Sequence, residues 1–83
     1  MTKKQAQWLV DFYKPRMGYR VDGKTIQWHI DAINIINNTS RGVPSCKCEY
    51  LITAKIAQST FAQHEEEIMK LYNEVPKRTK KGL

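Results

Sequence analysis

Four side chains in this 83-residue sequence can bind zinc through nitrogen or sulfur, and they are His29, Cys46, Cys48 and His64. A Cys2His2 set is sufficient for a closed tetrahedral site. However, Cys-x-Cys is not the usual zinc-ligand spacing, and residues two apart on a helix point about 200° apart. Each histidine also lies among apolar residues, where a histidine is more often a core residue with one hydrogen bond. We therefore expect no metal cofactor, and we keep a zinc-stapled module as the less favoured alternative.

The two cysteines, in "PSCKCEYL" (residues 44–51), raise the question of their oxidation state. A bridge between residues only two apart would close a very small ring, so we predict reduced thiols in the first turn of a helix, at least one of them buried. Two cysteines are too few for a disulfide-rich secreted scaffold, and the N-terminal residues lack the apolar core of a signal peptide. These features predict a protein of the cytoplasm, or of a particle assembled there.

Other residue types that carry out catalysis form no convincing set. Glu65, Glu66 and Glu67 point in different directions around a helix, and we interpret them as a solvated face. The sequence has no Gly-rich phosphate loop and no Ser/His/Asp set at a recognised spacing. We therefore predict that the protein is not an enzyme and has no small-molecule substrate.

Basic and aromatic residues alternate in "FYKPRMGYR", residues 12–20. Aromatic rings can stack on bases while basic groups contact phosphate. The formal net charge is +6, and its positive part is concentrated in residues 1–24 and 76–83. An equally weighted interpretation places the aromatic rings in the core and leaves the charges on the surface. The residues that we predict to bind nucleic acid or another acidic partner are Lys14, Arg16, Tyr19, Arg20, Lys77, Arg78, Lys80 and Lys81.

The apolar periodicity predicts an all-α protein with helices over residues 3–14, 25–37 and 46–75. Pro15 should end the first helix, because a proline disfavours helical geometry in the residue before it. The second helix is apolar over more than half its circumference, so we expect it to be central. Ser45 is the expected N-cap of the third helix. Asp22-Gly23 is a turn pair, and the residues on either side of it can form a tiny β-hairpin around residues 19–26.

The third helix carries a continuous apolar stripe close to a heptad pattern. As one helix it would be about 45 Å long, whereas a compact globule of this size is about 30 Å across. We therefore expect it to break near Ser59-Thr60, or to project and pack on a partner. Leu51, Ile52 and Ile56 lie off the stripe and widen the apolar surface. The residues predicted to form a protein interface are Tyr50, Ala54, Ala57, Phe61, Ile68 and Tyr72.

Residues 1–75 are predicted to form one small helical domain and residues 76–83 a basic tail. No apolar run approaches the ~20 residues of a membrane-spanning helix, so we expect a soluble protein. The favoured function is a non-enzymatic assembly or adaptor protein, held in a larger complex by a protein partner or as a homo-oligomer. A viral or nucleoprotein particle would suit such a chain. The alternative is a small DNA- or RNA-binding regulatory protein.

Overall fold

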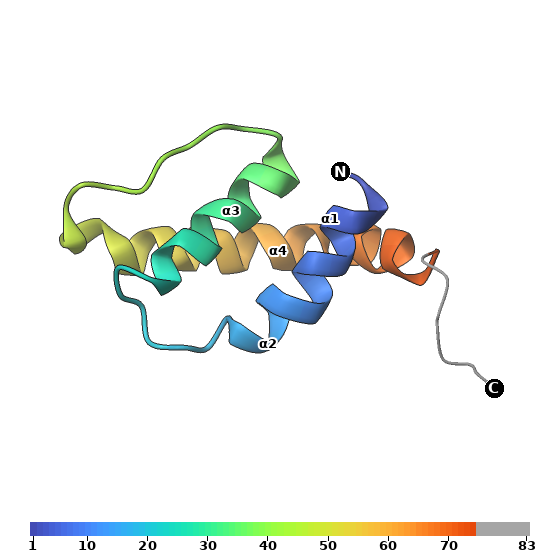
Figure 1. Cartoon of the computed structure of the whole chain (residues 1–83), viewed down its shortest axis with the longest axis horizontal. Coiled ribbons are helices and arrows are strands. Elements are labelled where there is room, and N and C mark those ends of the chain that lie inside the picture. Colours follow the sequence, from blue (N-terminus) through green and yellow to red (C-terminus); the bar gives the residue numbers. More distant parts are fainter. Residues whose placement is uncertain (75–83) are drawn as a thin grey trace.

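The structure is a computed structural model, and it describes residues 1–74 of the chain. An N-terminal helix and α3 cross the same side of the long helix α4, and they run in opposite directions across it (Figure 1). The described residues contain helices and turns and no strand, so the all-α prediction is confirmed. The elements are α1 (Lys3–Trp8), η1 (Leu9–Tyr13), α2 (Lys14–Arg16), α3 (Thr25–Asn37), η2 (Lys47–Glu49) and α4 (Tyr50–Asn73).

The N-terminal helix is α1, η1 and α2 taken together, and it begins with a capping box. The Thr2 hydroxyl accepts a hydrogen bond from the Gln5 N–H (3.1 Å), and the Gln5 side chain accepts one from the Thr2 N–H (2.9 Å). Pro15 does not end this helix, contrary to prediction. A π-helical turn precedes it, in which the Lys14 N–H bonds to the Leu9 carbonyl. This wider turn gives the proline ring room that an α-helix would deny it.

The tiny hairpin considered for residues 19–26 is not formed, because α3 already begins at Thr25. The Asp22 carboxylate accepts hydrogen bonds from the Lys24 and Thr25 N–H groups, both at 2.9 Å. These two backbone hydrogen bonds lower the pKa of Asp22, and the bond from Thr25 has the larger effect. Asp22 thus satisfies free N–H groups at the start of a helix instead of closing a two-stranded turn.

α4 is the helix on which both others pack, so it takes the central place that we predicted for the second helix. It runs without a break past Ser59-Thr60, and the described part of the molecule is 48 Å in its longest dimension. In place of a Ser45 cap, the helix is preceded by the 3-10 turn η2, whose N-cap is Cys46. None of the helices within residues 1–74 is both long and apolar enough to cross a membrane.

The core lies between α4 and the two helices that cross it. α3 supplies three fully buried isoleucines, and the N-terminal helix supplies Leu9 and Tyr13. The N-terminal helix is also tied to the C-terminal half of α4 by polar contacts. Lys14 pairs with Glu65 (2.9 Å) and Lys3 with Glu74 (3.5 Å). The buried apolar residues are Ala6, Leu9, Tyr13, Ile26, Ile30, Ala32, Ile33, Ala54, Ala57, Phe61 and Ile68.

Candidate functional site

The stripe predicted as a protein interface lies inside the chain's own fold. Ala54, Ala57, Phe61 and Ile68 are at most 2% exposed. Tyr50 and Tyr72 are half-buried at the two ends of α4. The Tyr72 hydroxyl donates to the Asp11 carboxylate at 2.9 Å, and this bond raises the pKa of Tyr72. These residues therefore hold α4 to the N-terminal helix and α3, and a partner would have to use another face.

The outer face of α4 carries a group of exposed apolar side chains near its N-terminus, which we call the isoleucine patch: Leu51, Ile52 and Ile56. Their exposed fractions are 57%, 61% and 41%. Further along the same face, a shallow hollow of about 420 Å³ is lined by Ile52, Lys55, Ile56, Ser59, Thr60 and Gln63. The face then becomes acidic at Glu66 and Glu67, which are both exposed. One helix face thus combines an apolar half that carries Lys55 with a polar half that carries Glu66, Glu67 and Lys70.

A second surface lies where the N-terminal helix and α3 meet, and four aromatic rings form an aromatic strip there: Trp8, Phe12, Trp28 and Tyr19. Trp8 stacks on Phe12 (5.4 Å between ring centroids) and Phe12 meets Trp28 edge to face (5.3 Å). Tyr19 packs against Trp28 at 5.9 Å, yet it is 53% exposed. The Arg16 guanidinium lies 4.1 Å from the centre of the Phe12 ring.

The predicted acidic-partner residues fall on different sides of the molecule. Tyr19 belongs to the aromatic strip, Arg16 lies over its Phe12 ring, and Arg20 is exposed next to Tyr19 in the sequence. Lys14 instead pairs with Glu65 of α4. The four basic residues predicted in the tail, Lys77, Arg78, Lys80 and Lys81, lie outside the described residues.

Sequence reasoning missed two members of the aromatic strip, Trp8 and Trp28. The signal for Trp8 was present, because Lys4, Trp8, Phe12 and Arg16 follow one another at intervals of four and so share a helix face. Trp28 was assigned to a helix buried on several sides. In the structure it is half-buried, roughly opposite the isoleucines with which α3 packs on α4.

His29 is a core residue and its ring is fully buried. Its Nδ1 is hydrogen-bonded to the Tyr13 hydroxyl at 2.8 Å, and its Nε2 has no hydrogen-bond partner among the described residues. Burial lowers the pKa of His29 and raises that of Tyr13. The pair is therefore neutral and structural, as the sequence interpretation of His29 proposed.

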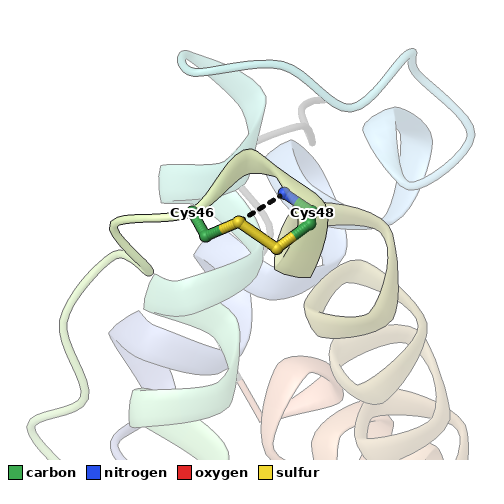
Figure 2. Close-up of a disulfide and its surroundings, with 2 residues drawn as sticks. All are labelled: Cys46 and Cys48. Atoms are coloured by element: carbon green, nitrogen blue, oxygen red, sulfur yellow. Dashed lines mark hydrogen bonds between the residues drawn. A yellow bond between two sulfur atoms is a disulfide. The ribbon is translucent and has the colours of Figure 1, made fainter.

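The prediction of reduced thiols was wrong, because Cys46 and Cys48 form a disulfide (Figure 2). Their Cα atoms are 5.2 Å apart, within the usual range for a disulfide. The sequence argument placed both residues in a helix, whereas Cys46 has an extended backbone and only Cys48 lies in the 3-10 turn. The Cys48 N–H donates to the Cys46 sulfur at 3.2 Å. Both cysteines are exposed, not buried.

The four side chains considered as zinc ligands are not gathered in one place. His29 is buried against Tyr13, the cysteines are bonded to each other, and His64 Nδ1 is hydrogen-bonded to the Thr60 carbonyl at 2.9 Å. Within residues 1–74 there is no group of three or more His, Cys, Asp or Glu side chains arranged to hold a metal ion.

Comparisons of the chain with protein-family models, curated proteins and solved structures give no match. The case for a function therefore rests on the isoleucine patch and the aromatic strip.

Proposed function

We propose that this chain is a non-enzymatic assembly protein that pairs with a second copy of itself through the outer face of α4. The observation that carries this proposal is the isoleucine patch, in which three large apolar side chains are 41–61% exposed within two turns of one helix. Complete burial of such a side chain contributes about 1.5–3 kcal/mol. Clustered apolar side chains on one helix face are typical of protein contact sites.

The charge pattern of the same face favours a second copy of the chain as its binding partner. The patch and Lys55 lie in the N-terminal half of the face, and Glu66 lies in the C-terminal half. Two copies of α4 that pair antiparallel bring Lys55 of each near Glu66 of the other. Such a two-fold contact is self-complementary.

Side-chain size supports the same arrangement. Ser59 and Ala62 are small, exposed residues midway along the face, and they would lie at the crossing point of the two helices. Small residues there let the helix axes come close. In this register the patch of each copy lies opposite the C-terminal half of the other, where Ile52 packs on the aliphatic part of the exposed Lys70 side chain. The apolar contact supplies the energy, while exposed charge pairs, worth about 0.2–1 kcal/mol each, set the orientation.

The test is sedimentation equilibrium of the full chain over a wide concentration range. We expect a monomer–dimer equilibrium, and Ile56→Glu should weaken the dimer about tenfold or more because it places an unpaired charge in the contact. Val43→Glu is the matched control, since Val43 is equally exposed (41%) but lies outside α4. A chain that stays monomeric at every concentration would show that a second copy is not the binding partner of the outer face of α4.

A charge-reversal pair tests the antiparallel arrangement separately. Lys55→Glu alone should weaken the dimer, because it meets Glu66 of the second copy. Adding Glu66→Lys to the same chain should restore the dimer, since each contact then regains opposite charges. A dimer that tolerates Ile56→Glu, or that is not restored by the double reversal, would contradict this geometry.

A further inference from the structure

We propose that the aromatic strip binds single-stranded nucleic acid, with its rings stacking on bases and the basic side chains beside it contacting phosphates. This inference does not depend on self-association, because the strip lies on the N-terminal helix, α3 and the turn between them, whereas the dimer contact lies on the outer face of α4.

The placement of the basic residues follows from helix geometry. Lys4 precedes Trp8 by four residues, and Lys24 precedes Trp28 by four, so each lysine lies on the same side of its helix as its tryptophan. Because the two helices run in opposite directions (Figure 1), the lysines lie toward opposite ends of the strip. From Lys4 to Arg16 the helix rises about 18 Å. At about 3.4 Å per stacked nucleotide, this length matches roughly five nucleotides.

The rings offer surfaces on which a base can stack. Tyr19 at one end is more than half exposed. Trp8 at the other end lines a hollow of about 470 Å³ between α1 and α3, together with Lys4 and Ile35. A base on an aromatic ring gains about 1–3 kcal/mol in single-strand complexes. Bases in a duplex are already stacked on one another, so this surface favours a single strand.

The charges around the strip favour a polyanion over an apolar protein surface. Lys4, Arg20 and Lys24 are exposed, and none of them forms an ion pair within residues 1–74. Asp11 accepts a hydrogen bond from Tyr72, and Asp22 accepts from the backbone and also interacts electrostatically with Arg20, whose charge contributes to the lowered pKa of Asp22.

Asp31 is the carboxylate that borders the strip, on the wall of the hollow beside Trp8. It is half-buried and accepts a hydrogen bond from Gln27 at 2.8 Å. A carboxylate at this place can accept a hydrogen bond from the exocyclic amino group of a base, as it does for cytosine in DNA. Asp31 can therefore contact the bases of the strand, whereas the lysines can contact its phosphates.

Tryptophan fluorescence provides a direct test, because the chain has two tryptophans and both lie in the strip. An unlabelled 12-nucleotide single strand should quench this fluorescence on binding, and the matched duplex should bind more weakly. Polyglutamate, which has negative charge but no bases, should cause no quenching. Tighter binding of the duplex, or equal binding of polyglutamate, would overturn the proposal and favour a general acidic partner.

Variants separate stacking from charge. Tyr19→Ala should weaken single-strand binding by about 5- to 150-fold, whereas Tyr19→Phe, which keeps the ring, should bind like the original chain. Lys24→Gln should weaken binding and reduce the slope of log K against log salt by about 0.7. Lys47→Gln, which removes an exposed lysine of η2 outside both proposed surfaces, is its matched control and should change neither value. Equal effects of Tyr19→Ala and Tyr19→Phe, or of the two lysine variants, would contradict the assigned surface.

Discussion

At the scale of single residues, the buried pair Tyr13–His29 makes the stability of the fold sensitive to pH. Burial lowers the pKa of His29 below its ordinary value of 6.5, so the unfolded chain binds a proton more readily than the folded one. As pH falls below 6.5, the free energy of unfolding therefore decreases, until the lower pKa of the folded state is passed.

We predict that the free energy of unfolding falls by up to about 1.4 kcal/mol per pH unit just below pH 6.5. Urea denaturation at several pH values measures it. His29→Leu should remove this slope, even though it also leaves the Tyr13 hydroxyl without its partner. His64→Gln is the control and should keep the slope. Loss of the Asp22 contribution begins only near its ordinary pKa of 3.8, so the two effects are separable. An unchanged slope in His29→Leu would refute the assignment.

The cysteines show where residue-level prediction failed. Their spacing was interpreted on the assumption that both lie in one helix, and backbone geometry one residue before the helix decides otherwise. Cys46 is extended, and this conformation turns its side chain toward Cys48. The cytoplasmic location had been argued in part from reduced thiols. Because the cysteines form a disulfide, that part of the argument no longer holds, and the cytoplasmic location stays a prediction.

At the scale of elements, hydrophobic periodicity located the three helical regions, because helix amphipathicity is a property of neighbouring residues. What the helices pack on is a property of the whole chain. The stripe from Tyr50 to Tyr72 was assigned to a partner because the helix is longer than a compact globule. Its cover instead comes from two short helices that cross it obliquely (Figure 1). The π turn before Pro15 was not predicted either, because the sequence argument treated the proline only as the end of the helix.

The two faces of α4 should respond differently to truncation. Phe61→Ala should lower the free energy of unfolding by about 3–5 kcal/mol, because it opens a cavity in the core. Leu51→Ala should change it by no more than about 0.5 kcal/mol when measured at concentrations where the chain is monomeric. Chemical denaturation followed by circular dichroism compares them. Similar losses for both variants would mean that the inner face is not the main source of stability.

At the scale of the whole molecule, the proposed binding surfaces lie on different sides of one small fold. The C-terminal half of the outer face of α4 carries Glu66, Glu67 and Lys70, whereas the aromatic strip is bordered mainly by lysines and arginines. Pairing through α4 would therefore leave both aromatic strips of a dimer exposed. Four of the basic residues, in the segment 76–83, lie outside the described residues, so their part in binding rests on charge alone.

Charge and stacking contribute to binding in ways that a salt titration distinguishes. Each phosphate that a basic side chain neutralises on a single strand adds about −0.7 to the slope of log K against log salt, whereas stacking adds nothing to it. Replacing Lys77, Arg78, Lys80 and Lys81 by Gln should therefore flatten the slope by up to about 3 units and leave the maximal tryptophan quenching unchanged. Tyr19→Ala should do the reverse, lowering affinity at every salt concentration with the slope preserved. If the Gln-substituted chain binds with an unchanged slope, the tail does not contact the strand, and an acidic protein surface becomes its more suitable target. If it binds but no longer quenches, the bases reach the aromatic strip only when the tail holds the strand in place.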